Sequence, residues 1–304
     1  MIGKNLLKSN DILSIIFIIS FSLLLIFYVF PFFLIFAISL FKYYHGSYYF
    51  YGLKNYFSII HKAYFKVALF NTLVLTAIRV IFITAFSLFV SILLIPFSEK
   101  IKTFFKISFY VPAIISSSVI SVIWYYFFQE DGLINYFILH YLNPVLKFLF
   151  NSTIQPISWL QNPSSAWIAI LITVLLKSPG PSIVILSSAI SVIPKSYYEV
   201  ADMDGATFLQ KFRYIILPLI KPALFLVMIL NTITSFHIFA EVYVLTDEGP
   251  GYSTAFLLTR IYKEAFITGN VGNAAVLSVI LFLIISFLVF IESIILKSNE
   301  EVEF

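Results

Sequence analysis

The chain has 304 residues, of which 61% are hydrophobic and 11% are charged, whereas a soluble domain is about 45–50% apolar and about 25% charged. This composition excludes a typical soluble domain and predicts a polytopic membrane protein. The formal charge of +4 comes from basic residues spread over short connecting segments, which is typical of membrane flanks and not of a nucleic-acid-binding stripe. The absence of cysteine excludes disulfides, thiolate metal sites and cysteine nucleophiles.

Six apolar segments are long enough to cross a membrane, since a helix of about 20 residues spans a hydrocarbon core of about 30 Å. They are residues 13–40, 67–95, 107–128, 165–189, 223–245 and 271–296. The first is too long for the apolar region of a signal peptide and lacks a small-residue cleavage site, so we expect it to remain as an anchor. Residues 1–12 and 297–304 are then a short head and tail.

The basic residues predict the orientation. Ten lysines and arginines lie in the head, the tail and the connections on their side of the membrane, against seven on the other side. Early positive charge, here Lys4 and Lys8, normally sets the orientation. We therefore expect both termini and the segment 193–222 in the cytoplasm. The connections on the outer side are too short for a separate folded domain and are expected only to dock an external protein.

The segment 193–222 is polar and charged although it lies between two spans. Tyr197, Val200 and Ala201 share one face of a short amphipathic helix. Gly205 adopts positive φ without a Cβ penalty, which predicts a corner after this helix. A second helix follows, with Phe208, Phe212, Ile215 and Ile216 as its apolar stripe. Physics alone leaves two interpretations open, a helix pair lying on the lipid headgroups and a helix pair docked on another protein.

The residue identities in this segment resemble the EAA signature of binding-protein-dependent importer permeases. The matching residues are Glu199, Val200, Ala201, Asp204, Gly205, Ala206, Ile215, Leu217 and Pro218. Val200 departs from the alanine that is usual in the family. Further segments resemble the sugar-type permeases in family order: 52–56, 71–73, Trp124 with 132–136, 241–246 and 249–254. The chain therefore resembles an ABC importer permease of the maltose and glycerol-3-phosphate type of carbohydrate family, specifically the longer of its two permease subunits.

This resemblance implies an all-α membrane fold, the type I importer permease, with six transmembrane helices and a cytoplasmic helix-turn-helix coupling loop. It also implies a prokaryotic inner or plasma membrane, a second permease, usually a distinct homologue in this family, two ATP-binding subunits and an extracytoplasmic solute-binding protein. No glycine in the chain belongs to a GxxxxGK motif followed by serine or threonine, so ATP and Mg²⁺ are expected on the partner ATPases and no cofactor or metal on this chain. The expected ATPase-coupling residues are Glu199, Ala201, Asp204, Gly205 and Phe208, although Asp204 also suits simple helix termination.

Polar residues inside the predicted spans are candidates for a substrate path, because such groups face a bundle interior or a wet cavity. Asn231, Ser235 and, more loosely, Glu241 are expected on one side of the fifth span, and Lys177 lies mid-segment in the fourth, just before a break at Pro179. The alternative is that these groups bind neighbouring helices, or, for Lys177, that it snorkels. Arg79 in the second span is equally ambiguous.

Two other classes of membrane protein, a secondary transporter and a membrane-embedded enzyme, would have different sequence features. A secondary, ion-coupled transporter needs carboxylates at mid-membrane depth and inverted repeats, and only Glu241 and Glu292 approach this requirement. A membrane-embedded enzyme needs a nucleophile with a base, or a metal cluster, yet the sequence has no HExxH motif and His237 stands alone in its span. Neither class explains the segment 193–222.

Overall fold

The computed structural model describes residues 2–44 and 46–297. The chain divides into two compact units. The first comprises Met1–Lys62 with Ile261–Ile280, and the second comprises Ala63–Arg260 with Leu281–Phe304. The expected tail, 297–304, lies outside the described residues except for Lys297. The expected head is helical from Ile2, because α1 already begins there.

The first unit begins with a long apolar helix. It consists of α1 (Ile2–Leu24), the π turn η1 (Leu25–Val29) and α2 (Phe30–Ser39). Residues Leu13–Ser39 are long and apolar enough to cross a membrane, which is why the sequence predicts this span. The hairpin β1 (Phe41–Tyr44) and β2 (Ser47–Phe50) follows, with Phe41 opposite Phe50, and then α3 (Lys54–Ile60). This two-stranded hairpin is an addition to the all-α architecture expected.

A buried amide secures the start of this hairpin. The Nδ2 of Asn55 donates to the carbonyl oxygens of Ser39 (3.0 Å) and Phe41 (3.1 Å). The same strand is approached by α17 (Val271–Lys297), because a Cβ built on Gly272 would lie 2.3 Å from the Phe41 carbonyl oxygen. Glycine is therefore required at residue 272 for space.

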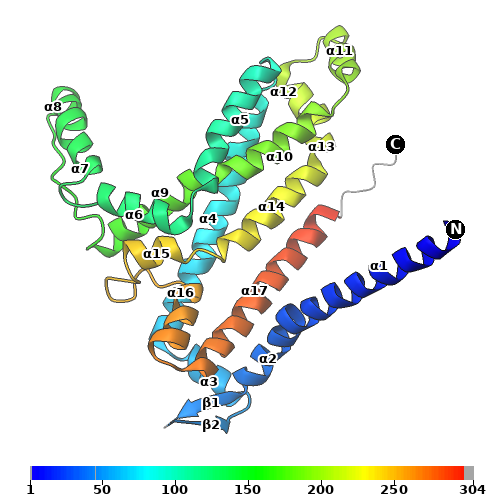
Figure 1. Cartoon of the computed structure of the whole chain (residues 1–304). Coiled ribbons are helices and arrows are strands. Elements are labelled where there is room, and N and C mark those ends of the chain that lie inside the picture. Colours follow the sequence, from blue (N-terminus) through cyan, green and yellow to red (C-terminus); the bar gives the residue numbers. More distant parts are fainter. Residues whose placement is uncertain (1, 45, 298–304) are drawn as a thin grey trace. The chain divides into compact units, whose positions relative to one another are not determined.

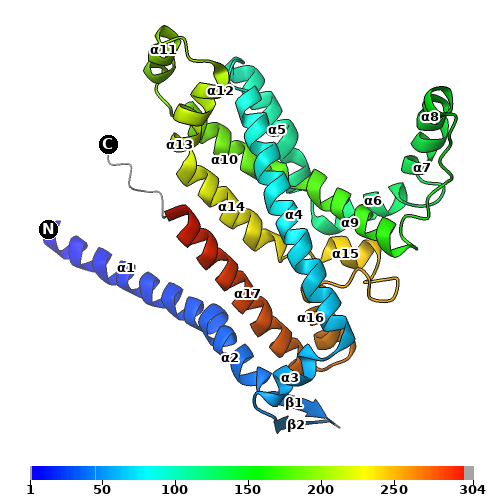
Figure 2. The same cartoon turned by 180° about the vertical axis from the view of Figure 1, so that it is seen from behind.

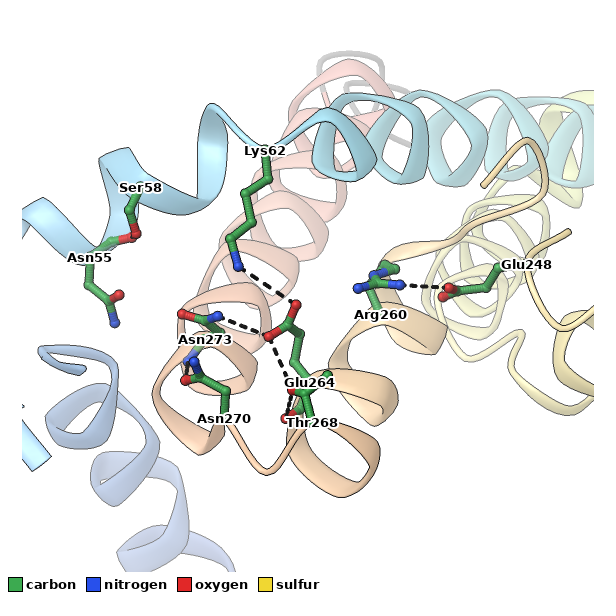
Figure 3. A network of polar contacts seen from close by, with 9 residues as sticks. All are labelled: Asn55, Ser58, Lys62, Glu248, Arg260, Glu264, Thr268, Asn270 and Asn273. Carbon is green, nitrogen blue, oxygen red and sulfur yellow. Dashed lines mark hydrogen bonds and ion pairs between the residues drawn. The ribbon is translucent and has the colours of Figure 1, made fainter. Parts of the chain in front are cut away.

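A polar network closes the turn between η4 (Lys263–Ile267) and α17 (Figure 3). The buried carboxylate of Glu264 accepts from Asn273 Nδ2 (2.9 Å) and pairs with Lys62 Nζ (3.8 Å). Its backbone oxygen accepts from Asn270 N–H (2.7 Å), and Asn270 Oδ1 in turn accepts from Asn273 N–H (3.1 Å). The first N–H groups of a helix have no partner inside it. The side chain of Asn270 supplies one for Asn273 and so caps the start of α17.

The second unit is a bundle of helices. Its elements in chain order are α4 (Ala63–Leu93), α5 (Glu99–Ile114), α6 (Ser117–Phe127), α7 (Leu133–Phe137), η2 (Ile138–Leu142), α8 (Asn143–Phe150), α9 (Pro163–Lys177), α10 (Pro179–Ser191), α11 (Lys195–Met203), α12 (Phe208–Lys211), η3 (Phe212–Ile216), α13 (Leu217–Leu219), α14 (Lys221–Ser235), α15 (Ala240–Leu245), most of α16 (Leu257–Tyr262) and the end of α17. The long α4 packs against α10 and α14, α10 packs against α5, and α15 packs against α6 and α9 (Figures 1 and 2).

Buried aliphatic side chains hold these helices together. One cluster includes Leu75, Val174 and Val242, and another joins Ile190 to Ile216 and Ile220. At the contact of α10 with α5, a Cβ on Gly180 would lie 2.4 Å from the carbonyl oxygen of Phe109. The two backbones thus touch where glycine leaves room.

Among the described residues, five helices are long and apolar enough to cross a membrane, or up to seven if each of two bent helix pairs counts as one span. Four of the predicted spans, 13–40, 67–95, 165–189 and 271–296, correspond to helices of this set. The helix that corresponds to 165–189 is Pro163–Ser191, which is interrupted between α9 and α10. The structure differs from the other two predictions, and it adds the segment Leu133–Phe150, which was expected to lie outside the spans.

The predicted span 107–128 is two helices, α5 and α6, that meet at 90°. Pro112 lies inside α5 and lacks the N–H that an α-helix uses. Residues 116–118 are all serine, and short polar side chains compete with helical backbone hydrogen bonds. The apolar pattern of the sequence predicts a membrane segment here, but it does not predict the bend between α5 and α6.

The predicted span 223–245 is wrong as one continuous helix. It belongs to α14, which ends at Ser235, and α15, which begins at Ala240. Tight turns close the end of α14, since Phe236 N–H donates to Ile233 O (3.3 Å) and His237 N–H donates to Thr234 O (3.2 Å).

Candidate functional site

The polar loop after α10 is a helix, a corner and a second helix, as the sequence predicts. Gly205 has φ +70°. Its N–H donates to Asp202 O (3.1 Å), and Ala206 N–H donates to Ala201 O (2.9 Å). This is the Schellman termination, in which the residue after the helix is left-handed. A Cβ at residue 205 would meet nothing within 4 Å, so glycine is favoured there by backbone conformation and not by space.

The second helix of the loop starts with a reciprocal cap. Thr207 Oγ1 accepts from Gln210 N–H (3.4 Å), while Gln210 Oε1 accepts from Thr207 N–H (2.7 Å). This capping box satisfies N–H groups that have no partner inside the helix. An ion pair between Lys211 and Asp202 joins the two helices across the corner. The loop is thereby held in shape by its own side chains.

The loop exposes apolar side chains on the face away from its base. Met203 is 80% exposed, and Tyr197, Val200, Phe208 and Leu209 are also exposed. In the base, Phe212 and Tyr198 pack on the cluster of Ile190, Ile216 and Ile220, and burial raises the pKa of the Tyr198 hydroxyl. The expected single stripe over Phe208, Phe212, Ile215 and Ile216 is therefore wrong, because Phe208 faces outward while Phe212 and Ile216 face inward.

The other expected coupling residues lie on the same loop. Glu199 and Asp204 are exposed, and Ala201 is half-buried. Figures 1 and 2 show α11 and α12 beyond the adjacent ends of α5 and α10, at one end of the second unit. The five expected residues thus gather on one protruding element.

A buried arginine organises the end of α14. Arg79 of α4 is 7% exposed. Its Nη1 donates to the carbonyl oxygen of Asn231 (2.8 Å), to Thr234 Oγ1 (2.8 Å) and to Ser235 Oγ (2.9 Å). Asn231 Nδ2 also donates to Ser182 Oγ of α10 (3.2 Å). Asn231 and Ser235 therefore share one face of α14, as their spacing predicts.

A second polar group surrounds Lys177 at the end of α9. Its Nζ lies 3.6 Å from Glu241 Oε1 of α15 and also donates to Ser117 Oγ at the start of α6. Lys177 therefore joins three helix ends. Glu241 does not share a helix with Asn231 and Ser235, so the expectation that all three lie along one helix is wrong for Glu241.

The sequence left Arg79 ambiguous and missed Ser117 and Ser182 as partners. A charged residue within an apolar span was itself a signal, since such residues pair inside the bundle. Serines carry no comparable signal, because most of them are partnered by their own helix. Among the described residues, no group of three or more His, Cys, Asp or Glu side chains is placed to hold a metal ion.

Two of the segments that resemble the sugar-type permeases, 71–73 and 249–254, are in contact in the structure. Asn71 Nδ2 donates to the carbonyl oxygens of Ser253 (2.8 Å) and Ala255 (3.0 Å), and its Oδ1 accepts from Trp167 Nε1 (3.2 Å). The same loop is tied to α16 by the buried ion pair of Glu248 with Arg260, at 2.8 Å (Figure 3). The loop 246–256 thus has a defined shape.

Residues 7–296 match a family model, the binding-protein-dependent transport system inner membrane component. The chain belongs to this family. Membership in the binding-protein-dependent transport family makes the chain a multi-pass permease component of an importer and does not favour a secondary transporter.

Two relatives and one solved structure are similar over most of the chain. The arabinooligosaccharides transport system permease protein AraP of Bacillus subtilis is 28% identical over 272 residues, 88% of this chain and 82% of the relative. The inner membrane ABC transporter permease protein YcjO of Escherichia coli is 32% identical over 239 residues, 78% of this chain and 76% of the relative. A bacterial alginate ABC transporter, solved with an alginate pentasaccharide-bound periplasmic protein, has a TM-score of 0.79 at 17% identity and covers 98% of both chains. The last comparison shows a shared fold.

Proposed function

We propose that this chain is one permease subunit of an ATP-driven ABC importer that moves a sugar or a sugar-like solute by alternating access. The observation that carries the proposal is the protruding helix–corner–helix at Gly205, which bears the EAA-like residues in a chain of the binding-protein-dependent family. The sugar class is supported by the arabinooligosaccharides of one relative and the alginate of the structural neighbour.

In this proposal, ATP and Mg²⁺ bind to two partner subunits, and the loop transmits the conformational change of these subunits to the transmembrane helices. The exposed side chains of Tyr197, Val200, Met203, Phe208 and Leu209 would fill a groove on an ATPase, as an amphipathic helix does. Glu199, Asp204 and Gly205 shape and orient the contact. ATP binds better to the closed ATPase pair and so shifts the permease toward its outward-facing state.

The remaining partners follow from the same assignment. A second permease, a distinct homologue, completes the pore, and an extracytoplasmic solute-binding protein delivers the solute. Both termini and the loop 193–222 lie in the cytoplasm, and the protein resides in the prokaryotic inner or plasma membrane. The support for this orientation is the excess of lysine and arginine on that side, beginning with Lys4 and Lys8.

We place the substrate path beside the break between α14 and α15. Around this region lie Asn231 and Ser235 of α14, Glu241 of α15 and Lys177 of α9, and Arg79 contacts the end of α14. Amide, hydroxyl and charged groups match the hydroxyls of a carbohydrate as hydrogen-bond partners. The bonds that these groups make to each other fix the shape of the path, while exposed groups near the break, such as Thr234 and His237, contact the solute.

Copurification tests the coupling proposal. The variant Met203→Glu puts a charge into the contact, and an unpaired charge buried at an interface is strongly unfavourable. Copurification of the co-expressed ATPase and ATP-dependent uptake should both fall about tenfold, which corresponds to about 1.4 kcal/mol. Tyr49→Glu is a matched control, because Tyr49 is exposed on β2 of the other unit. Unchanged copurification and uptake in Met203→Glu contradict the proposal.

A further inference from the structure

The segment Leu133–Phe150, formed by α7, η2 and α8, is an apolar helical arm. It is long and apolar enough to cross a membrane, yet most of its residues are exposed. Phe148 is 88% exposed. The other exposed large apolar residues of the arm are Leu133, Tyr136, Phe137, Leu139, Tyr141, Leu142, Val145, Leu149 and Phe150. Figures 1 and 2 show α7 and α8 extending away from the other helices of the second unit, beyond the end of α6.

The arm does not span, because the chain that follows it runs straight back along it. Asn143 Nδ2 donates to Ile154 O (2.9 Å), and Ile154 N–H donates to Asn143 Oδ1 (2.8 Å). Asn135 makes the same two-way contact with Ile157, at 2.9 Å and 3.1 Å. Two amide clasps thus fix residues 151–157 against the helix in the antiparallel direction. The arm leaves the bundle and returns to it at the same end.

The π turn η2 is what aligns the two clasps. In a regular α-helix of 3.6 residues per turn, a spacing of eight residues would rotate Asn143 by about 80° from Asn135. A π turn takes up one extra residue, so the spacing acts as about seven residues, or two full turns. Both amides then face the return segment, and Asn135 and Ile138 are buried on that side.

The two layers of the arm differ in polarity. The return segment begins Asn-Ser-Thr and contains Gln155, whereas Lys147 is the only charged residue in 133–150 and no acidic residue occurs there. A typical protein–protein interface is only about as apolar as the rest of a protein surface, at about 56–58%. The outer face of the arm is almost entirely aliphatic and aromatic, with Tyr136, Tyr141 and His140 among its exposed rings. Tyrosine is enriched at membrane interfaces, and a lysine there attracts anionic headgroups.

We propose that this arm lies flat in the membrane–water interface on the side opposite the coupling loop, with its apolar face in lipid and its return segment toward water. The side follows from the chain itself, because the single span formed by α9 and α10 separates the arm from the loop. An interfacial helix buries its apolar face about 5–10 Å into the headgroup and acyl boundary. The arm braces the end of α6 and the start of α9 against the bilayer surface. This role is independent of the solute and of the ATPase contact.

Fluorescent labels on single cysteines test the proposal, since the natural chain has no cysteine. An environment-sensitive dye is placed at Phe148→Cys on the arm and at Ser152→Cys on the return segment, in the intact transporter with its partner subunits in liposomes. Both residues are exposed, so neither change disturbs packing. The dye at residue 148 should emit at shorter wavelength and lose most of its fluorescence to spin-labelled lipids, whereas the dye at residue 152 should respond to iodide in the water.

Two results overturn the proposal. Quenching by iodide at residue 148 places the arm in water. Quenching by neither agent at residue 148 places the arm against a protein, either the second permease or the binding protein. Tyr141→Cys gives a second reading on the same face and should behave like Phe148→Cys. Because the dyes report the environment without transport, failure of the solute or ATPase proposals leaves these outcomes unaffected.

Discussion

Arg79 Nη1 lies 2.8 Å from the carbonyl oxygen of Asn231, so a cation from α4 closes the C-terminal end of α14. The C-terminal turn of a helix carries partial negative charge, and a cation there is favourable. The same nitrogen reaches the hydroxyls of Thr234 and Ser235. This contact lies at the end of α14, where the proposed solute path begins.

Removing the arginine should destabilise the protein and distort the path. Arg79→Met removes a charged donor from the Asn231 carbonyl oxygen and from the hydroxyls of Thr234 and Ser235, and a hydrogen bond to a charged group contributes about 1.5–3 kcal/mol. Arg79→Lys keeps the charge but loses the fixed fork of donors, so its loss should be smaller. Thermal unfolding in detergent measures both variants. Arg213→Met, at an exposed residue, is the control, and equal melting temperatures for all four proteins would refute the role of Arg79.

The pair of Lys177 and Glu241 should behave as a coupled buried ion pair. Lys177→Met removes the cation that lies 3.6 Å from the buried carboxylate of Glu241, which costs more than losing both groups. The double variant Lys177→Met with Glu241→Gln should therefore be more stable than Lys177→Met alone. A double-mutant cycle on thermal stability should give a coupling of about 0.5–3 kcal/mol. The pair of Lys102 with the exposed Glu99 should show a much smaller coupling, and additivity at both pairs would contradict this account.

Substitutions at Gly205 should rank by backbone conformation and not by size, because the space around it is open. Asparagine tolerates the left-handed region and a β-branched residue does not. Gly205→Asn should therefore retain most ATPase copurification and coupled uptake, while Gly205→Val loses both. Each left-handed non-glycine residue costs about 1–2 kcal/mol. Full activity of Gly205→Val would show that the corner is not needed.

Gly180→Ala should destabilise the protein although alanine favours helices. At an exposed helix interior, this change gains about 1 kcal/mol. In α10 the new methyl group would meet the backbone of Phe109 at 2.4 Å and of Tyr110 at 2.7 Å, and backbone cannot rotate away as a side chain does. The melting temperature should fall. Ser188→Ala, on the exposed side of the same helix, should leave it unchanged, and a rise in Gly180→Ala would disprove the close approach of α5 and α10.

Local features of the fold were predictable from the sequence, and long-range ones were not. The corner at Gly205 and the break at Pro179 depend on nearby residues, and both are found where expected. The contact at the end of α14 is made by Arg79, which comes from a different helix, so the apolar pattern of α14 itself gives no sign of it. The sequence predicts the arm only as a connection between spans. Its shape depends on Asn135 and Asn143, which bind a segment that follows them in the chain. Periodicity reports which residues are apolar, but not which side chains from elsewhere interrupt a helix.

The same limit applies to the candidate site. The i,i+4 spacing was enough to place Asn231 and Ser235 on one face. It was not enough to place Glu241, whose partner Lys177 sits at the end of α9. The family resemblance located the loop, but only the structure distinguishes the outward Phe208 from the inward Phe212.

Site-specific cross-linking between the loop and the ATPase tests the central claim most directly. Met203→Cys supplies the only cysteine of the chain, and Tyr49→Cys serves as the control on the other unit. With a short reagent, Met203→Cys should cross-link to a co-expressed ATP-binding subunit, and the yield should change when a non-hydrolysable ATP analogue is added. Tyr49→Cys should give no such product. Absence of any cross-link from Met203→Cys, in a transporter that still takes up solute, would contradict the claim that this loop transmits the action of ATP.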